Sequence, residues 1–312
     1  MSKDALIFIS DYSDTEGWRR ELNRLMPALD FRVWPETGDK ADVKAALVWK
    51  HPHGALLQFP NLQIVTNLGA GVDHLVHDKA LPKDVVIARL IDPALTSRIT
   101  EYVILHTLAL HRRMPEMLEA QRRAQWRFIR PIEPGACRVG VMGLGNLGLN
   151  ALRALERLGF QVAGWSRTPK SLEDVSCFAG ADQLPKFLVD CDIVISLLPL
   201  TNATENLMNT RVFNQMRKGA AFISLGRGAT VVDDDLIDAL DREQLRHAVL
   251  DVFRTEPLPP THPFWTHRKI TITPHNSSVT SPVSAAPGVV EDIRRALAGQ
   301  LVLGRVDPAR GY

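Results

Sequence analysis

The sequence predicts an α/β protein with two domains, each built on a parallel sheet. The chain has 312 residues, which exceeds the usual size of one domain. Short apolar runs alternate with helical segments along most of its length. A glycine-rich turn at residues 137–148 stands between a strand and a helix. We expect the first domain to comprise residues 1–98 and 285–312, and the second to comprise residues 99–284.

The N-terminal part of the chain shows its own α/β pattern. Its apolar runs are Ala5–Ile9, Phe31–Trp34, Ala45–Trp49, Ile64–Asn67 and Val85–Ala88. Glycines come soon after the third and fourth runs, in segments 50–54 and 68–74. Glycines after a strand expose backbone N–H groups at the carboxyl end of a sheet, where open α/β sheets bind ligands. We therefore expect a carboxylate to bind at segment 68–74; the alternative is a plain tight turn.

Histidines are frequent in these two segments and just after them. They are His51, His53, His74 and His77. No acidic or cysteine partner stands at metal-ligand spacing from them, so we expect surface histidines and no metal site.

A long helical segment is expected from Ser97 to Gln125. Its second half carries a basic set, Arg112, Arg113, Arg122 and Arg123. Anion binding is one interpretation of these arginines, but a solvated helix face is favoured. Segment 126–135 then contains two prolines and a glycine, which is typical of a linker, here between the two domains.

The glycine-rich turn carries the first functional prediction. Gly143, Gly145 and Gly148 match G-x-G-x-x-G, after an apolar strand end and before helical spacing from Leu147 to Leu158. The first glycine permits a tight turn, the second lets the backbone approach a pyrophosphate, and the third lets helix and strand pack closely. Because the motif has the strand–turn–helix context that it requires, we predict a dinucleotide site rather than a structural turn.

Further strands and helices complete the second domain and the tail. The expected strands are Gln161–Trp165, Asp192–Leu198, Ala220–Leu225, Ala248–Leu250 and Ile270–Thr273. A helix starts near the three acids Asp233–Asp235, which suit its positive end. The last amphipathic helix, Ala285–Leu301, is expected to return to the first domain.

The end of the strand Gln161–Trp165 indicates the cofactor. An enzyme that selects NAD usually has an acid here, which binds the ribose 2′-hydroxyl. This chain has Ser166, Arg167, Thr168 and Lys170 instead. A hydroxyl and two cations suit a 2′-phosphate, so we predict NADPH, with NADH as a weaker alternative; a solvated basic turn is the other interpretation.

Three polar residues follow strands of the dinucleotide-binding half: Arg227, Glu256 and His275. Reduction of a 2-oxo acid needs a cation for the carboxylate and a proton donor for the ketone oxygen, beside the nicotinamide. Arg227 supplies a guanidinium that can grip a carboxylate bidentately. His275 supplies the proton, and Glu256 is the candidate to hold its ring and stabilise its protonated form.

Composition excludes several classes of protein. The net charge of +2, with 23% charged residues, gives no sign of nucleic-acid or membrane-surface binding. The N-terminal apolar run is too short for a secretory signal, and no run approaches a membrane span. Three cysteines suit a reducing cytosol rather than a disulfide framework, so a cytoplasmic location is expected.

An ordered set of motifs covers essentially the whole chain. They are Gly69-Ala70-Gly71-Val72-Asp73, Gly143–Gly148, Leu197-Leu198-Pro199-Leu200-Thr201, Ser224-Leu225-Gly226-Arg227-Gly228, Leu250-Asp251-Val252-Phe253 with Glu256-Pro257-Leu258-Pro259, Thr273-Pro274-His275, Val306-Asp307 and Arg310-Gly311-Tyr312. In these the chain resembles the D-isomer-specific 2-hydroxyacid dehydrogenase family, and within it the bacterial glyoxylate/hydroxypyruvate reductases. Asn276-Ser277-Ser278 departs from the small apolar residues more usual there, which affects fine substrate preference.

The resemblance implies a flavodoxin-like substrate domain, a Rossmann cofactor domain and a homodimer formed through segment 99–126. It implies that Arg227 anchors the substrate, that His275 is the proton donor and that Glu256 is its partner. It places the substrate at Trp49, Leu68, Gly69, Ala70 and Gly71. The implied cofactor residues are Gly143, Leu144, Gly145, Asn146, Leu147, Gly148, Ser166, Arg167, Thr168, Lys170, Leu198, Pro199, Leu225, Gly226 and Asp251.

The function expected from these features is NADPH-dependent reduction of glyoxylate or hydroxypyruvate. Two alternatives remain open. The same machinery could reduce bulkier 2-oxo acids, or the chain could be a non-catalytic dinucleotide sensor that recruits a partner. A sensor would not need Arg227, Glu256 and His275 together, and a DNA-associated corepressor would show tails or strong charge.

Overall fold

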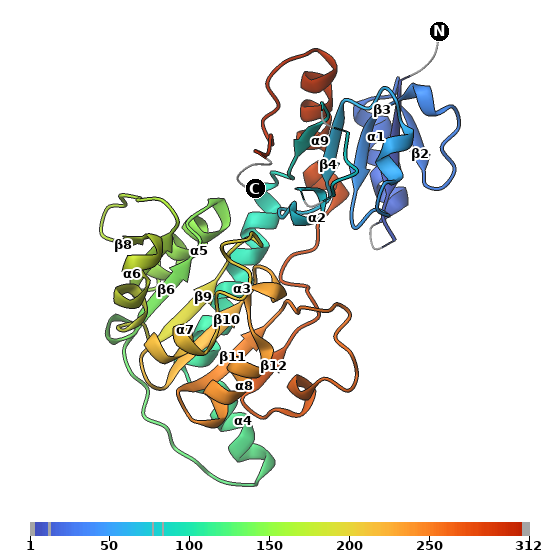
Figure 1. The fold of residues 1–312 in the computed structure, drawn as a ribbon. Helices are drawn as coiled ribbons and strands as arrows, with labels where there is room; N and C mark the ends of the chain where they lie inside the picture. The colour runs from blue at the N-terminus through green and yellow to red at the C-terminus, as the bar shows by residue number, and fades with distance from the viewer. Residues whose placement is uncertain (1–3, 12–13, 77, 83, 308–312) are drawn as a thin grey trace. The chain divides into compact units, whose positions relative to one another are not determined.

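The computed structural model describes residues 4–11, 14–76, 78–82 and 84–307 (Figure 1). The chain forms two compact units, unit 1 (Met1–Leu95 with Val279–Tyr312) and unit 2 (Thr96–Ser278). His77 and the Arg310-Gly311-Tyr312 motif lie outside the described residues.

The first crossing between units lies inside helix α3 (Pro93–His111), and the second follows Ser278. The expected linker at residues 126–135 was therefore wrong, because that whole segment belongs to unit 2. Its prolines interrupt helical periodicity without marking a boundary between units.

Unit 1 contains a five-stranded parallel sheet in the order β2-β1-β3-β4-β5 (Figure 1). Its strands are β1 (Ala5–Ile9), β2 (Asp30–Val33), β3 (Val43–Val48), β4 (Ile64–Asn67) and β5 (Val86–Ala88). This is the flavodoxin-like order that was expected. All five residues of β1 are buried, as a continuous apolar run predicts for an inner strand of a parallel sheet.

The helices of unit 1 include α1 (Thr15–Leu25), the short α2 (Asp73–Val76) and α9 (Pro282–Leu297). Asp14 caps α1 by accepting a hydrogen bond from the Gly17 N–H at 2.9 Å. Helix α9 packs against α1, and its Arg294 donates to the carbonyl of Leu25 at 2.8 Å. The C-terminal helix thus covers the N-terminal sheet.

Unit 2 contains a seven-stranded parallel sheet in the order β12-β11-β10-β9-β6-β7-β8. Its strands are β6 (Arg138–Met142), β7 (Gln161–Ser166), β8 (Ser176–Ala179), β9 (Ile193–Ser196), β10 (Ala220–Ser224), β11 (Leu245–Leu250) and β12 (Ile270–Ile272). The two predicted parallel-sheet domains are confirmed. Strand β8 was not expected, because this short edge strand is only half-buried and lacks a clear apolar run.

Unit 2 also contains most of α3 and five further helices among its described residues. They are α4 (Met114–Arg122), α5 (Asn146–Arg157), α6 (Gly180–Leu188), α7 (Thr210–Gln215) and α8 (Asp233–Asp241). The single helix expected over 97–125 was wrong. Arg113 adopts a left-handed φ of 58° between α3 and α4. Pro115 follows in the first turn of α4, where its missing N–H costs nothing.

The half-buried Arg246, on β11, forms a hydrogen bond with the C-terminal end of α3. It donates to the carbonyl of Leu110 at 3.2 Å and to that of Gly219 at 3.1 Å. A cation at a helix C-terminus opposes the negative end of the helix dipole. Burial lowers the pKa of Arg246.

No helix among the described residues is long and apolar enough to cross a membrane.

Candidate active site

The candidate residues of unit 2 follow strands whose ends are in register. One row across the sheet joins Ile272, Leu250, Ser224, Ser196 and Met142 through successive parallel pairs. His275 follows the first of these residues, Glu256 the second and Arg227 the third, while the glycine-rich turn follows the last. Because parallel strands end at one edge, the loops that carry the candidate residues share that edge.

The turn at Gly143–Gly148 has the geometry that the motif requires. Gly143 has a φ of 99°, and its N–H donates to the carbonyl of Trp165 at 2.8 Å. A Cβ on Gly148 would lie 1.8 Å from the Gly143 carbonyl oxygen, so helix α5 can approach the turn only with glycine there. A Cβ on Gly145 would meet nothing within 4 Å. That space lies beside the start of α5, where N–H groups favour a phosphate.

The other residues expected in the cofactor site near this turn differ in their exposure. Asn146 is exposed and donates to Thr96 Oγ1 at 3.0 Å. Leu147 is half-buried. The Leu144 side chain is buried against Gly164, so only its backbone can face a cofactor.

The turn after β7 is exposed and basic. Arg167, Thr168 and Lys170 all lie on the surface. Ser166 is buried, and its hydroxyl donates to the Thr168 carbonyl at 2.8 Å. The proton of the Ser166 hydroxyl is therefore engaged within the turn.

Arg227 stands in a loop that is fixed on both sides. A Cβ on Gly226 would lie 2.3 Å from the Leu198 carbonyl oxygen, and one on Gly228 would lie 1.9 Å from the carbonyl carbon of Phe253. The loops after β9, β10 and β11 therefore interlock through these two glycines. Arg227 is partly buried and donates from Nη1 to the Gly226 carbonyl at 2.9 Å.

The adjoining cofactor candidates Leu198 and Leu225 are buried, and Pro199 is half-buried. The backbone of Leu198 packs directly against Gly226, which leaves no space for a side chain at position 226. Their side chains belong to the packing beneath the loops, which leaves backbone groups for any cofactor contact.

His275 and Glu256 are brought together. The Nδ1 of His275 lies 2.8 Å from Oε2 of Glu256, while Oε1 of Glu256 accepts from the Phe253 N–H at 3.0 Å. With Nδ1 engaged by the carboxylate, a proton exchanged by this ring would have to come from Nε2. The His275 side chain is 30% exposed and that of Glu256 is 20% exposed, so the pair remains accessible.

Asp251 organises the turn that carries His275. His275 has a φ of 51°, a left-handed conformation that is uncommon for residues other than glycine. The fully buried Asp251 carboxylate accepts from Thr273 Oγ1 at 2.6 Å and from the N–H groups of Asn276 and Ser277, each at 3.0 Å. Three donors on one carboxylate hold this left-handed turn in place.

Tyr102 extends this network to helix α3. Its hydroxyl is hydrogen-bonded to Thr273 Oγ1, whose own proton goes to Asp251. Burial raises the pKa of Tyr102 to about 12, so it remains a donor at neutral pH. Sequence reasoning missed this role, since Tyr102 and Thr273 stand 171 positions apart in the chain and leave no local pattern.

In unit 1 the glycine segment after β4 is held by Asn67. Its buried side-chain amide donates to the carbonyls of Gly69 and Gly71. Thr280 Oγ1 donates to the carbonyl of Leu68 at 2.7 Å. With these carbonyls engaged, the loop is a fixed backbone surface that includes Ala70. Sequence reasoning missed Asn67, although a buried asparagine at a strand end is a signal that could have revealed it.

The expectation of surface histidines was wrong for His51. Its side chain is 2% exposed, and Nε2 lies 3.0 Å from Oδ2 of Asp78. His53, on the same carboxylate, is 75% exposed. The acidic partner of His51 is thus Asp78, which comes 27 residues later in the chain, too far for a spacing rule to detect.

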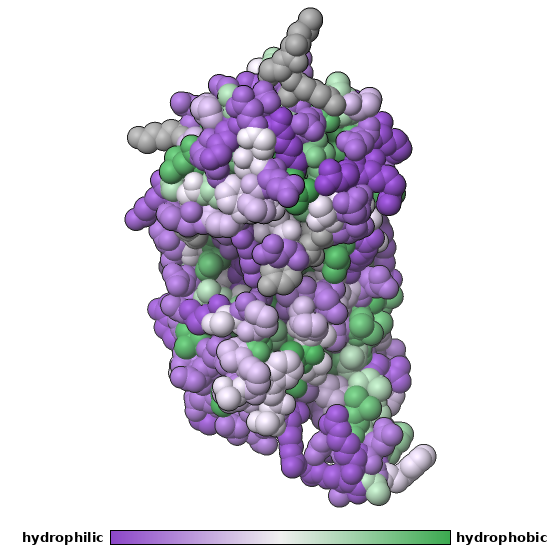
Figure 2. Space-filling model, turned by 90° about the vertical axis from the view of Figure 1, so that its right-hand side faces the viewer, coloured by the Kyte–Doolittle hydropathy of each residue, from purple (hydrophilic) through white to green (hydrophobic). Residues whose placement is uncertain are grey.

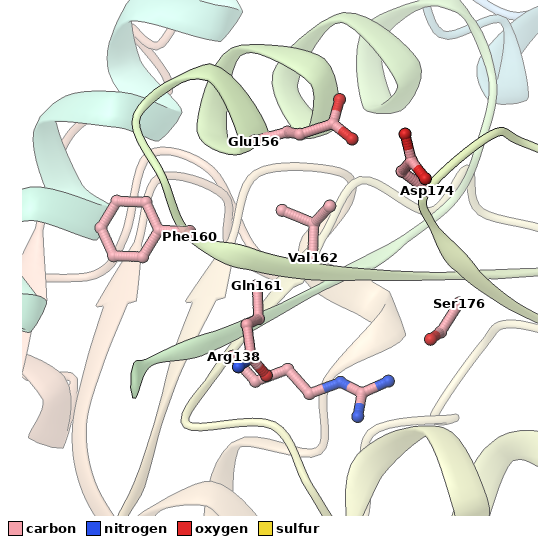
Figure 3. Close-up of a pocket in the computed structure, with 7 residues that line it drawn as sticks. All are labelled: Arg138, Glu156, Phe160, Gln161, Val162, Asp174 and Ser176. Atoms are coloured by element: carbon pink, nitrogen blue, oxygen red, sulfur yellow. The ribbon is translucent and has the colours of Figure 1, made fainter. Parts of the chain in front are cut away.

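A separate pocket in unit 2 has a volume of about 250 Å³. It is lined by Arg138, Glu156, Phe160, Gln161, Val162, Asp174 and Ser176 (Figure 3). Three of these residues begin strands β6, β7 and β8. The pocket therefore lies at the amino edge of the sheet, opposite the edge that carries Arg227 and His275, and we do not assign it to the active site.

The carboxyl edge of unit 2 thus offers a dinucleotide turn, a guanidinium and a histidine–carboxylate pair. This combination suits hydride transfer between a nicotinamide and a carbonyl compound that carries an anionic group. Fold and site together define a class, the nicotinamide-dependent dehydrogenases.

Comparison with known proteins identifies the family. Residues 104–277 match the description D-isomer specific 2-hydroxyacid dehydrogenase, NAD binding domain. The glyoxylate/hydroxypyruvate reductase A of Serratia proteamaculans is 38% identical over 98% of this chain and 99% of its own. That of Yersinia enterocolitica is 37% identical over the same shares. The chain belongs to the D-isomer-specific 2-hydroxyacid dehydrogenase family.

Two solved structures share the whole fold. A D-isomer specific 2-hydroxyacid dehydrogenase from Xanthobacter autotrophicus, in complex with NADPH and MES, is 44% identical with a TM-score of 0.96, covering 99% of this chain and 100% of its own. The NADPH-dependent glyoxylate/hydroxypyruvate reductase of Sinorhizobium meliloti, with NADP and sulfate, is 32% identical with a TM-score of 0.92 over the same shares.

Proposed function

We propose that this protein reduces a small 2-oxo acid, glyoxylate to glycolate or hydroxypyruvate to D-glycerate, with NADPH as the hydride donor. The observation that carries the proposal is the aligned strand edge of unit 2, where Arg227, the Glu256–His275 pair and the dinucleotide turn follow one row of paired residues. The names of the reductases that are 37–38% identical support the substrate class.

Each group has a defined part in the proposed reduction. Arg227 holds the substrate carboxylate with its planar guanidinium and polarises the ketone. His275 gives a proton from Nε2 to the ketone oxygen as hydride reaches the carbon, and Glu256 holds Nδ1 and stabilises the imidazolium. The backbone of Ala70 and Gly71 in unit 1, with Leu68, Gly69 and Trp49 beside it, is proposed to meet the substrate as well.

A turnover assay tests the substrate class. Glyoxylate, hydroxypyruvate, pyruvate and phenylpyruvate are offered with NADPH, and NADPH oxidation is followed at 340 nm. We expect the highest kcat/KM with glyoxylate or hydroxypyruvate. A preference for phenylpyruvate would favour the bulkier-substrate alternative. NADPH binding without turnover of any of the four would favour the dinucleotide sensor.

The cofactor proposal rests on the turn after β7. No acid stands there to repel a 2′-phosphate, and the exposed Arg167 and Lys170 can pair with one. Solved relatives in complex with NADPH or NADP support this choice. One charge-assisted contact contributes about 1.5–3 kcal/mol, which corresponds to roughly a ten- to hundredfold preference for NADPH over NADH.

Replacing Ser166 by aspartate and Arg167 by alanine together is expected to reverse this preference. The new carboxylate would accept from the free ribose hydroxyls of NADH and repel the phosphate of NADPH. The measurement compares kcat/KM for the two cofactors in wild type and variant. Arg242→Ala, which removes an exposed arginine paired with Asp238 on α8, is the matched control and should leave the ratio unchanged. Equal use of both cofactors by the wild type would remove this turn from phosphate recognition.

We also propose that the protein is a homodimer through the α3–α4 region. Large apolar side chains are exposed there: Leu105, Leu108, Met114, Leu118, Trp126, Phe128 and Ile132. Helix α4 and the segment after it form the lowest part of Figure 1, and Figure 2 shows green apolar side chains among purple ones at that level. An apolar surface of this kind is typical of an interface.

Sedimentation equilibrium tests the dimer. Wild type is expected at twice the chain mass, and the double variant Leu105→Glu with Leu118→Glu at the chain mass, because each interface would bury four added carboxylates. Val189→Glu, at an exposed valine just after α6, is the control and should remain dimeric. A monomeric wild type would overturn this part of the proposal. The cytosolic location expected from the cysteine count stays a prediction.

A further inference from the structure

Trp49 and the glycine segment of unit 1 fix each other's positions. A Cβ built on Gly69 would lie 2.7 Å from Cζ3 and 3.4 Å from Cη2 of Trp49. The indole therefore occupies the space that any side chain at position 69 would need. Whatever holds Trp49 in place also shapes the surface beside the backbone of Gly69–Gly71.

A row of aromatic rings joins Trp49 to His74 and His51. The rings of Trp49 and His74 meet edge to face, with centroids 5.6 Å apart. The ring of His74 in turn lies 5.9 Å from that of His51. The His74 and His51 rings are tilted by 54°, and ring contacts at such separations are favourable. The row connects Gly69 to the loop after β3 through side chains of two different segments.

The far end of the row is a buried histidine–carboxylate pair. The His51 side chain is 2% exposed and that of Asp78 is 4% exposed, and Nε2 of His51 lies 3.0 Å from Oδ2 of Asp78. Oδ1 of Asp78 accepts from the Ala80 N–H at 2.9 Å and contacts Nδ1 of His53 at 2.8 Å. Burial alone would raise the pKa of Asp78, but the hydrogen bonds from His51 and Ala80 outweigh it and hold that pKa below its ordinary value.

Two features of this arrangement oppose folding. Nδ1 of His51 is buried with no hydrogen-bond partner among the described residues, and an unsatisfied buried polar atom is destabilising. Lys50, between Trp49 and His51, has a φ of 50°, which is strained for a residue with a side chain. Such strain persists only where the surroundings fix the conformation, and it is concentrated at functional sites.

We propose that the buried His51–Asp78 pair is a specificity-determining device that holds Trp49 against Gly69 through the ring of His74. A fixed indole keeps the subsite beside Gly69–Gly71 small and excludes 2-oxo acids with large substituents. His51 is a positioning residue, since it acts on the substrate only through Trp49. The inference rests on the proposed function, because it assumes that this segment binds the substrate.

Two variants and a matched control test the device. His51→Ala removes the ring, and Asp78→Asn keeps the shape of the side chain but removes its charge. His53→Ala is the control, because His53 contacts the same carboxylate but is 75% exposed. Each enzyme is assayed with glyoxylate and with phenylpyruvate, and NADPH binding and the melting temperature establish that it is folded.

In both variants the ratio of kcat/KM for glyoxylate to that for phenylpyruvate is expected to fall about tenfold, the scale on which a pocket discriminates by size. The lower kcat/KM for glyoxylate should come from a higher KM, with kcat within about twofold of wild type. The reason is that the subsite widens while the catalytic groups are unchanged. His53→Ala should keep the wild-type ratio. In a cycle with Trp49→Ala, the effect of His51→Ala should vanish once the indole is absent.

An unchanged ratio in a folded Asp78→Asn enzyme, or an effect of His51→Ala that persists without Trp49, would overturn the inference. Hydrogen exchange of residues 66–76 gives a second readout that needs no turnover. It should be faster in His51→Ala and Asp78→Asn than in His53→Ala. If the wild type reduces none of the acids, the proposed function fails, and unchanged exchange in the first two variants would then overturn the device independently.

Discussion

Replacing Arg227 by alanine is expected to lower kcat/KM for the 2-oxo acid by roughly two to four orders of magnitude. A bidentate guanidinium–carboxylate contact comprises two charge-assisted hydrogen bonds of about 1.5–3 kcal/mol each. Each 1.4 kcal/mol of transition-state binding changes the rate tenfold. The interlocked Gly226 and Gly228 hold the loop from both sides, so the backbone should keep its position without the guanidinium.

Arg227→Lys separates charge from geometry. A lysine ammonium keeps the charge but cannot form the planar two-point contact, so this variant should recover only a small part of the loss. Steady-state kinetics with the preferred 2-oxo acid give the numbers, and the dissociation constant of NADPH should remain close to that of the wild type. Near-normal kcat/KM in Arg227→Ala would remove this residue from substrate binding.

The sequence predicts the fold of this chain well where burial is continuous. Strands such as β1 and β10 are apolar at almost every position, because inner strands of a parallel sheet are covered on both faces. Edge strand β8 is not predicted in this way, because an edge strand is only partly covered and does not need a continuous apolar run. The break at Arg113 was not predicted either, because the left-handed conformation occurs there at an arginine and not at a glycine, the residue type that usually signals it.

The sequence predicts the residues that could carry the chemistry of the candidate site, but not the hydrogen bonds that hold those residues in place. Arg227, Glu256 and His275 follow strands, and the parallel order alone places their loops at one edge. Asp251 was expected in the cofactor site, yet its carboxylate accepts hydrogen bonds from the turn of His275. The partner of a buried polar residue depends on which distant segment lies against it, and spacing along the chain does not encode that.

The His51–Asp78 pair illustrates the same limit. Metal-ligand spacing rules examine residues close together in sequence. Here the carboxylate comes from a different loop, after the next strand of the sheet. Only the adjacency of β3 and β4 brings the two loops together.

Removing the proton donor is the second change with a large expected effect. His275→Ala should lower kcat by about two to four orders of magnitude, the usual contribution of a positioned general acid. Exogenous imidazole should restore part of the activity if the residue donates a proton. A merely structural histidine would show no such rescue. Binding of NADPH should stay within a few-fold of wild type, because the dinucleotide turn follows β6 and the histidine follows β12 at the far end of the sheet.

Glu256→Gln is expected to lower kcat less than His275→Ala does, by about one to two orders of magnitude. The glutamine oxygen can still accept from Nδ1 of His275, which preserves the ring orientation that the 2.8 Å contact defines. The amide lacks the negative charge that faces the ring while the proton is transferred, so the transfer should be slower. Glu256→Ala should lose more, because it also removes the acceptor of the Phe253 N–H. Rapid-quench or stopped-flow measurement of the hydride step, with NADPH against its 4-deuterated form, separates this loss from slow product release. If the hydride step in Glu256→Gln were as fast as in the wild type, His275 would not depend on this carboxylate.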